Sequence, residues 1–307
     1  MSQKLLFVFN PHSGKGLIKN NLLEIVDTMV KAGFEVTIYT TQAQGDATRK
    51  IAEDAKNFDR VVCSGGDGTL DEVVTGMVQS GVNVPIGYIP AGSTNDFANS
   101  LEIPKNMVKA AQIAVNGKPF PCDMGYFNGD TFVYVAAFGL FTEVTYKTPQ
   151  QLKNIFGHAA YVIEGAKTLH DIPSYHLDVH CNDVHIQDEF IFGMITNSVS
   201  VGGFKGMTGP DVKLDDGVFE VTLIRVPRNP LELNEIIRCL TNRIDDTDMI
   251  YSFKTEELRI TSREEVSWTL DGEYGGTAKE WEIRNRHKEV TILVDENSSV
   301  IDKSKLS

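Results

Sequence analysis

Short apolar runs alternate with segments of helical periodicity over the first 120 residues of the chain. The runs are rich in β-branched and aromatic side chains and predict strands at Leu5–Phe9, Val36–Tyr39, Val61–Cys63 and Ile86–Ile89. Apolar positions three and four residues apart predict helices at Asn20–Lys31, Asp46–Lys56, Leu70–Gln79 and Val108–Val115. Strands that alternate with helices in this way predict an α/β domain whose parallel sheet carries helices on both faces.

From Phe120 onward the pattern changes to alternating strands joined by tight turns. Asn-Gly and Asp-Gly pairs, which favour hairpin turns, occur at Asn128-Gly129, Asp216-Gly217 and Asp271-Gly272. Strands are expected at Leu177–Val179, Phe190–Thr196, Val218–Arg225, Leu258–Thr261 and Val290–Val294, and helices at Pro149–Leu169 and Pro230–Asn242. We therefore predict an α/β domain in residues 1–120 and a mainly antiparallel, β-rich domain in residues 121–295. The polar tail 296–307 either frays or packs back onto the first domain.

Composition narrows the functional classes. The chain has 29 Lys and Arg against 42 Asp and Glu, a formal net charge of −13, which argues against a nucleic-acid partner. The longest apolar stretch, Phe132–Phe141, is about half of the roughly 20 residues that a transmembrane helix needs. The run Leu5–Phe9 is too short for a signal peptide, and the four cysteines are widely spaced, as in proteins of a reducing compartment. These features predict a cytoplasmic protein that meets any lipid at a surface.

The first predicted strand is followed by a turn of small and polar residues, Asn10, Pro11, His12, Ser13 and Gly14. Backbone N–H groups in such a turn can bind an anion at the start of a helix. The turn is not a Walker A loop, because the first glycine of that motif is missing and no Ser or Thr follows Lys15. By itself the turn fits a phosphate site and an ordinary strand-to-helix connection equally well.

The loop after the third strand, Ser64–Glu72, is the strongest signal in the chain. Gly65, Gly66 and Gly68 allow a polyphosphate to approach the backbone, and Thr69 can cap the following helix. Asp67 lies among them, and a carboxylate beside phosphates requires a divalent cation between the two, which implies a magnesium nucleotide. A dinucleotide fingerprint would need a glycine where Asp71 stands.

A third small-residue loop, Pro90–Phe97, follows the fourth strand and contains Ser93 and Asp96. Ligands of parallel sheets bind beyond the carboxyl ends of the strands. Three such loops at one sheet edge therefore predict a phosphate-binding site.

These motifs together resemble the catalytic domain of the diacylglycerol kinase family, which also includes sphingosine, ceramide and bacterial phosphatidylglycerol kinases. The resemblance rests on N-P-x-S-G, G-G-D-G-T-L-x-E and G-S-x-N-D-F, and it continues through Lys213–Gly217 and Leu270–Glu273. It covers nearly the whole chain and is closest to the small stand-alone bacterial enzymes. Many relatives carry Asn where Asp71 stands.

The resemblance implies an ATP-binding first domain, a lipid-acceptor second domain and an active site in the cleft between them. It implies ATP contacts at Asn10, Pro11, His12, Ser13, Gly14, Thr41, Gly66, Asp67, Gly68, Thr69, Leu70, Asp71, Glu72 and Ser93. It also implies a structural Mg²⁺ bound by Asp216 and by the main-chain oxygens of Lys213 and Val218. Glu273 is implied as the proton acceptor.

The residues themselves leave two interpretations of the second-domain carboxylates. Asp271-Gly272 fits a type I′ turn, so Glu273 is either a solvated strand residue or the base that a lipid hydroxyl requires. Asp215-Asp216 is either a solvated turn or part of a hard-cation site. Asp271 is expected to orient Glu273, and Asp67 to organise the water shell of the metal. Asp96 and Asp123 are candidate anchors for that water.

The resulting prediction is a lipid kinase that transfers the γ-phosphate of ATP to the hydroxyl of a lipid. Diacylglycerol is the expected acceptor. The protein would associate peripherally with the membrane, and the sequence is compatible with a homodimer. The alternatives are an NAD kinase, which shares a G-G-D-G motif, and a catalytically silent lipid- or nucleotide-binding protein.

Overall fold

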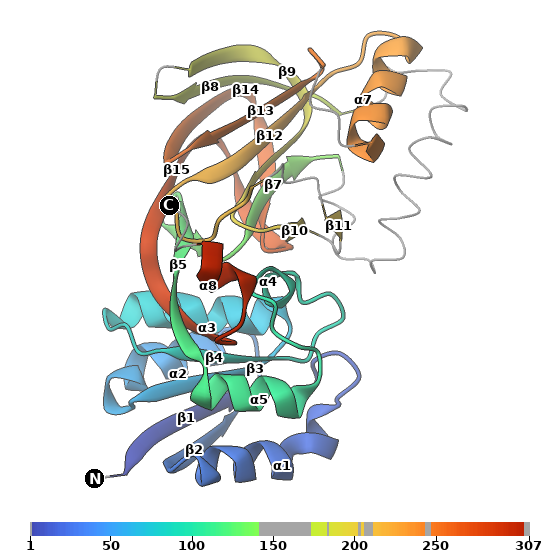
Figure 1. The fold of residues 1–307 in the computed structure, drawn as a ribbon. Coiled ribbons are helices and arrows are strands. Elements are labelled where there is room, and N and C mark those ends of the chain that lie inside the picture. The colour runs from blue at the N-terminus through green and yellow to red at the C-terminus, as the bar shows by residue number, and fades with distance from the viewer. Residues whose placement is uncertain are drawn as a thin grey trace. The chain divides into compact units, whose positions relative to one another are not determined.

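The computed structural model describes residues 2–140, 173–182, 184–201, 204–205, 211–242 and 247–303. The chain forms two compact units (Figure 1), unit 1 comprising Met1–Met124 with His287–Ser307 and unit 2 comprising Gly125–Arg286. The helix expected at Pro149–Leu169 lies outside the described residues. Among those residues, none of the helices combines the length and the apolar character that crossing a bilayer requires.

Unit 1 is built on a parallel sheet. Its strands are β1 (Gln3–Phe9), β2 (Phe34–Thr40), β3 (Arg60–Gly65), β4 (Ile86–Pro90) and the last part of β15 (Glu273–Val294). They lie in the order β2-β1-β3-β4-β15, and every pairing in this row is parallel. The four apolar runs of the first 120 residues therefore form neighbouring strands.

Helices cover both faces of this sheet. Figure 1 shows α1 (Ile18–Lys31) and α5 (Met107–Asn116) on one face, and α2 (Asp46–Asp54) and α3 (Asp67–Ser80) on the other. Three short helices complete the unit: the 3₁₀ turn η1 (Ala55–Asn57), α4 (Asp96–Ser100) and α8 (Ser299–Lys303). Helix α3 starts three residues earlier than expected, because Gly66 takes an extended conformation as its N-cap.

Unit 2 is a largely antiparallel sheet. Its strands are β6 (Asp130–Phe132), β7 (Val135–Gly139), β8 (Tyr175–Cys181), β9 (Val184–Thr196), β12 (Phe219–Arg225), β13 (Ile250–Thr255), β14 (Glu257–Leu270) and the first part of β15. The order is β13-β12-β9-β7-β14-β15, with β8 beside both β9 and β14. The small ribbon β10 (Ser200–Val201) and β11 (Phe204–Lys205) and the helix α7 (Pro230–Asn242) complete the described part.

The core of unit 2 is centred on Trp268, whose ring lies 5.0 Å from that of Phe127, 4.8 Å from that of Phe138 and 5.8 Å from that of Trp281. The four cysteines of the chain are reduced and buried.

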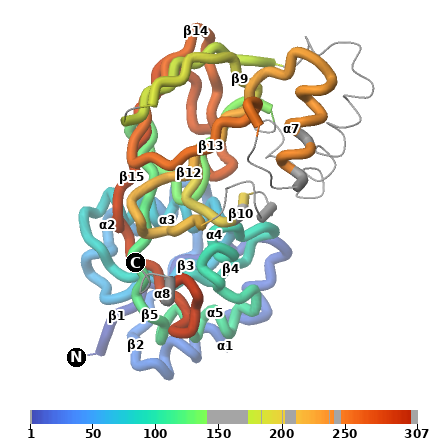
Figure 2. Tube along the Cα trace, turned by 45° about the horizontal axis from the view of Figure 1, so that its top comes forward, coloured from blue at the N-terminus to red at the C-terminus, as the bar shows by residue number. Residues whose placement is uncertain are grey.

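The boundaries of the units differ from those expected at 120/121 and 295/296. The chain leaves unit 1 within β5 (Lys118–Phe127) and returns to it within β15, which can be followed in Figures 1 and 2. Residues 287–295 belong to unit 1 because the end of β15 pairs with β4, through Ile292 and Ile86. We expected only a short strand at Val290–Val294, whereas β15 has 22 residues.

The described part of the C-terminal tail, residues 296–303, lies against unit 1. The Oγ of Ser298 and the backbone N–H of Ser299 each donate a hydrogen bond of 2.8 Å to the carboxylate of Glu102, in the loop between α4 and α5. This contact places α8, red in Figure 2, on the first unit.

Candidate active site

Three loops meet at the carboxyl edge of the unit 1 sheet. The register places Phe9 beside Ser64 and Gly65 beside Pro90, so β1, β3 and β4 end side by side. The loops that follow are joined by hydrogen bonds: the N–H of Gly66 donates to Oγ of Ser13 at 3.2 Å, and the N–H of Ala91 donates to the carbonyl of Gly65 at 2.7 Å. The structure therefore brings together three loops that the sequence separates by about 80 residues.

The glycines of these loops are required because the loop backbones pack against one another. A Cβ on Gly14 would lie 2.2 Å from the carbonyl oxygen of Ala91, and a Cβ on Gly92 would lie 2.7 Å from the Cα of Gly66. Gly14 also has a φ of +56°, which L-residues rarely adopt. The absence of side chains at Gly14 and Gly92 thus allows the backbones of the three loops to pack against one another.

Gly14→Ala is expected to weaken ATP binding and to lower the melting temperature more than Gly16→Ala does. Both positions have positive φ, +56° and +64°, so both variants carry the same backbone strain. Only at Gly14 does the new methyl group clash, because the nearest atom to a Cβ on Gly16 is 3.7 Å away. Overpacking of this kind typically costs about 1–3 kcal/mol. Calorimetric ATP affinities that are equal for the two variants would contradict the role of Gly14 in loop packing.

Asp67 joins the second loop to the third. Its carboxylate accepts hydrogen bonds from the N–H of Asp96 at 3.2 Å and from the N–H of Phe97 at 3.4 Å, at the start of α4. The side chain thus stabilises a helix N-terminus, as carboxylates often do. Asp96 is buried, with 1% of its surface exposed.

Asn95 also supports the third loop, a role that the sequence did not indicate. It has a φ of +55°, and its side chain makes two hydrogen bonds to Gly92, accepting from the N–H at 2.9 Å and donating to the carbonyl at 2.8 Å. Asn tolerates this left-handed conformation better than most residues, and that tolerance was the available signal.

Glu72 and Thr41 support the loops from neighbouring elements. The carboxylate of Glu72 accepts hydrogen bonds from the N–H of Gly45 at 2.9 Å and from the N–H of Ala47 at 3.0 Å, at the N-terminus of α2. Thr41 is buried, and its N–H donates to the carbonyl of Phe9 at 3.0 Å. In the same turn, hydrogen bonds from the N–H groups of Gln42 and Ala43 lower the pKa of Asp46.

The remaining ATP-contact candidates differ in exposure. His12, Gly14 and Ser93 are exposed, whereas Thr69 and Leu70 are buried. The other members of the set are half-buried: Asn10, Pro11, Ser13, Gly66, Asp67, Gly68, Asp71 and Glu72. Leu70 belongs to the core, so only its backbone is available to a ligand.

Asp123, a candidate anchor for metal-bound water, is held by β15. Its Oδ1 accepts a hydrogen bond from the N–H of Lys288 at 2.7 Å and lies 3.0 Å from Nδ1 of His287. The carboxylate of Asp123 is fully buried, while the His287 side chain is half exposed.

The Asp271-Gly272 pair forms the turn between β14 and β15. Asp271 has a φ of +51° and Gly272 a φ of +89°, which confirms the expected type I′ turn. The carboxylate of Asp271 accepts hydrogen bonds from three consecutive backbone N–H groups, those of Val133 at 2.5 Å, Tyr134 at 2.9 Å and Val135 at 2.9 Å. Asp271 therefore binds the β6–β7 connection to the turn.

Glu273 follows the turn as the first residue of β15 and is exposed. It pairs in register with Leu270, the last residue of β14. Because Asp271 belongs to the turn, the two carboxylates are not on one face of a continuous strand. The buried Asp271 holds the turn, and the exposed Glu273 is presented by it.

The loop with the expected magnesium ligands, Lys213, Asp216 and Val218, leads into β12. Asp216 has no positive φ, so Asp216-Gly217 is not a type I′ turn. The N–H of Val218 donates to Oδ1 of Asp216 at 3.4 Å. Within unit 2 the register places Glu220 beside Thr196, and Thr196 beside Val135, the residue that donates to Asp271. The Asp216 loop and the Asp271 turn thus lie at the same end of the sheet.

Glu220 adds a second carboxylate to this loop. It is 5% exposed, and burial raises its pKa from 4.5 to about 7, with the charge of Asp216 acting in the same direction. Nζ of Lys254 lies 3.0 Å from Oε1 of Glu220 and 4.0 Å from Oδ2 of Asp216, yet neither Glu220 oxygen has a well-aligned hydrogen bond. The ammonium group of Lys254 thus offsets part of the negative charge of both carboxylates.

Asp216→Ala is expected to abolish most of the stabilisation that Mg²⁺ gives the protein. An ion that binds only the folded state adds about 2.7 kcal/mol at 100 times its Kd. The measurement is the melting temperature with and without Mg²⁺, and Asp211→Asn, which removes a charge from the same loop, is the control. A variant that responds to Mg²⁺ as the parent does would place the ion elsewhere.

Comparison with known proteins agrees with these motifs. Residues 4–127 match the family model of the diacylglycerol kinase catalytic domain. A diacylglycerol kinase of Bacillus subtilis (strain 168) is 35% identical over 276 residues, which cover 88% of this chain and 89% of that protein. One of Staphylococcus aureus (strain Newman) is 36% identical over 281 residues, 90% of this chain and 88% of that protein.

A solved structure shows the same fold. The crystal structure of a putative diacylglycerol kinase from Bacillus anthracis str. Sterne superposes with a TM-score of 0.81 at 25% identity, covering 97% of this chain and 99% of that chain. The match therefore includes both units. On its sequence relatives and its fold, this chain belongs to the diacylglycerol kinase family.

Proposed function

We propose that this protein is an ATP-dependent diacylglycerol kinase, which transfers the γ-phosphate of ATP to the hydroxyl of diacylglycerol and forms phosphatidic acid. The observation that carries the proposal is the junction of three small-residue loops at one edge of the unit 1 sheet. These loops are joined by hydrogen bonds from the N–H of Gly66 to Oγ of Ser13 and from the N–H of Ala91 to the carbonyl of Gly65. The names of the relatives in Bacillus subtilis and Staphylococcus aureus support diacylglycerol as the acceptor.

ATP binding is assigned to unit 1. The triphosphate would contact the backbone of Asn10–Gly14 and of Gly66–Glu72, with Thr41 and Ser93 at the ends of the site. Helix α3 begins at Asp67, directly after the glycines, so its N-terminal N–H groups favour bound phosphate. Glu72 acts on this site indirectly, because its carboxylate holds the start of α2.

Glu273 is the proposed general base. It is exposed, whereas the Asp271 carboxylate already accepts three backbone N–H groups. Glu273 would accept the proton of the lipid hydroxyl as that oxygen attacks the γ-phosphate. Asp271 would act as a positioning residue, since it fixes the turn that presents Glu273.

Mg²⁺ is the proposed metal in two roles, and the ion bound with ATP would neutralise negative charge on the phosphates. A second, structural Mg²⁺ would be bound by Asp216 and the main-chain oxygens of Lys213 and Val218, with Glu220 as a further carboxylate beside them. Asp67, Asp96 and Asp123 are proposed to hold water around a nucleotide-bound ion. For Asp67, this role has to coexist with its hydrogen bonds to α4.

The remaining parts of the proposal concern location. We propose that ATP is bound by unit 1 and the lipid by unit 2. The protein would be cytoplasmic and would associate peripherally with the membrane during catalysis, without a nucleic-acid partner, and this proposal is compatible with a homodimer.

The test is phosphoryl transfer by the pure protein. The protein is incubated with labelled ATP, Mg²⁺ and micelles that contain diacylglycerol, phosphatidylglycerol or a sphingoid base, and the labelled product is identified. Labelled phosphatidic acid is the expected product. ADP release with NAD, and none with any lipid, would identify an NAD kinase instead, and no turnover with any acceptor would indicate a binding protein.

A further inference from the structure

The hairpin of β8 and β9 gathers two histidines and an aspartate on its outer face. The strands pair in antiparallel register, with His180 directly opposite His185 and Asp178 two residues before His180. The alternate residues of β8, Leu177 and Val179, are buried in the unit 2 core. Because side chains alternate along a strand, the histidines and Asp178 share the solvent-facing side.

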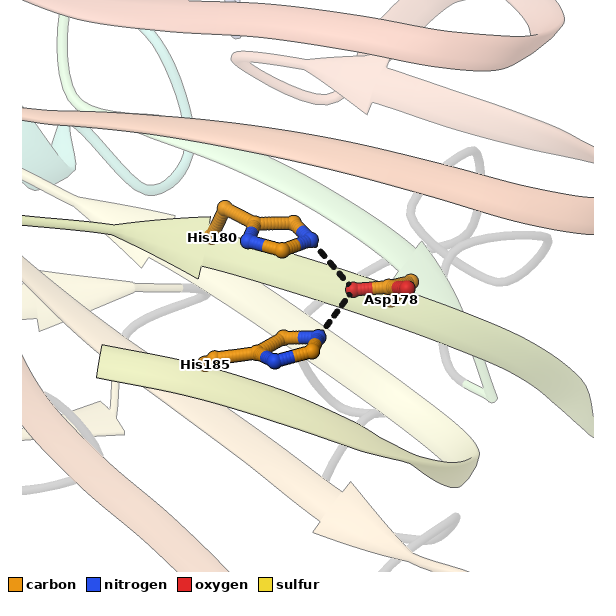
Figure 3. Close-up of side chains that lie close together, drawn as sticks. All are labelled: Asp178, His180 and His185. Carbon is orange, nitrogen blue, oxygen red and sulfur yellow. Dashed lines mark hydrogen bonds and ion pairs between the residues drawn. The ribbon is translucent and has the colours of Figure 1, made fainter. Parts of the chain in front are cut away.

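The polar atoms of the three side chains converge on one point. Nε2 of His180 lies 2.7 Å from Oδ1 of Asp178, and Nε2 of His185 lies 2.8 Å from the same oxygen (Figure 3). The two imidazole rings are stacked, with centroids 4.1 Å apart and an interplanar angle of 16°. One potential ligand atom of each residue lies within 4.8 Å of the others.

We propose that Asp178, His180 and His185 form a binding site for a divalent transition metal ion, for which Zn²⁺ is the probe. Imidazole nitrogen and carboxylate oxygen are ligands that Zn²⁺ prefers, and three protein ligands with a water molecule complete a tetrahedron. Zn–N distances of about 2.0–2.1 Å require ligand atoms about 3.4 Å apart in that geometry. The carboxylate would therefore withdraw from each nitrogen by roughly two thirds of an ångström, from 2.7 and 2.8 Å to about 3.4 Å.

The surroundings of the cluster suit a metal ion. The His180 and His185 side chains are 53% and 56% exposed, so an ion and its water can reach them. Nε2 of Gln187 lies 3.5 Å from Oδ2 of Asp178, where it would orient the carboxylate. Nitrogen ligands also separate this site from the all-oxygen site expected around Asp216, because imidazole favours transition metals over Mg²⁺.

An ion at this position would join β8 to β9 near their connecting turn. Its ligands come from both strands, so unfolding of the hairpin would release it. Binding would therefore stabilise unit 2 by mass action, without a part in the kinase reaction.

The experiment uses the full-length protein without a polyhistidine tag, freed of metal by a chelator and then supplied with excess Mg²⁺ to fill the oxygen sites. Titration with Zn²⁺ is expected to show one equivalent bound per chain. At a free Zn²⁺ concentration of about 100 times its Kd, the melting temperature of unit 2 is expected to rise by roughly 5–10 °C.

Variants identify the ligands. His180→Ala and His185→Ala are each expected to weaken Zn²⁺ binding by more than the roughly 10–100-fold that the loss of an outer partner costs. His176→Ala is the matched control, because His176 lies on the same face of β8 but contacts Glu264, 2.9 Å away. Equal melting temperatures of all variants in chelator would show that they fold normally.

Two results would overturn the proposal. If the double variant His180→Ala/His185→Ala binds Zn²⁺ as tightly as the parent, the ion lies at another site. If the parent binds no Zn²⁺, the cluster is only a hydrogen-bonded triad.

Discussion

Glu273→Gln is expected to lower kcat by about 10²–10⁴, the usual cost of removing a general base. Glutamine keeps the size and the hydrogen-bonding capacity of the side chain but cannot accept the proton of the lipid hydroxyl. The loss corresponds to about 3–5 kcal/mol of transition-state stabilisation. ATP affinity is expected to stay unchanged, because the candidate phosphate contacts are in unit 1. Steady-state kinetics and calorimetric titration with ATP measure the two quantities separately.

Glu280→Gln is the matched control for this change. Glu280 is an exposed carboxylate on the same strand, and its replacement alters the net charge equally. The parental kcat is expected for Glu280→Gln. If the Glu273→Gln variant binds ATP with the parental affinity and has a kcat close to that of the parent, Glu273 is not the base.

Asp271→Ala is expected to destabilise unit 2. The variant is expected to lose its activity because it loses its folded structure. The change leaves three backbone N–H groups, those of Val133, Tyr134 and Val135, without their acceptor. A buried donor that loses its partner costs about 1–3 kcal/mol. Alanine also tolerates the φ of +51° poorly, which adds about 1–2 kcal/mol. Three such donors and the backbone strain add up to roughly 4–11 kcal/mol, to be measured by denaturant unfolding, which is comparable with the stability of a whole domain.

Asp271→Asn separates the structural role of this residue from a chemical one. Asparagine tolerates positive φ and keeps one acceptor oxygen, so it should be much more stable than Asp271→Ala. A positioning role predicts partial activity that follows the recovered stability. A fully stable but inactive Asp271→Asn, beside an active Glu273→Gln, would instead make Asp271 the base.

The local features of the site could be predicted from the sequence because they depend on neighbouring residues. Apolar runs of four or five residues define β1 and β4, and glycines mark the loops that follow β1, β3 and β4. The Asp271-Gly272 pair specifies its turn, because few residues adopt two successive positive φ angles. The order of these motifs along the chain was sufficient to indicate the family.

Other properties depend on contacts between distant segments, and only the tertiary structure decided them. The sequence shows Asp67 and Glu72 as two acidic residues of one motif, yet their carboxylates hold different helices, α4 and α2. Periodicity indicated only the apolar end of β15, because the rest of that strand is polar and is specified by its pairing with β14. His180 and His185 likewise face each other only because a hairpin register aligns them. Each of these outcomes is set by the partner that folding supplies to a side chain or a strand, and a linear pattern of hydrophobic and polar positions does not contain that partner.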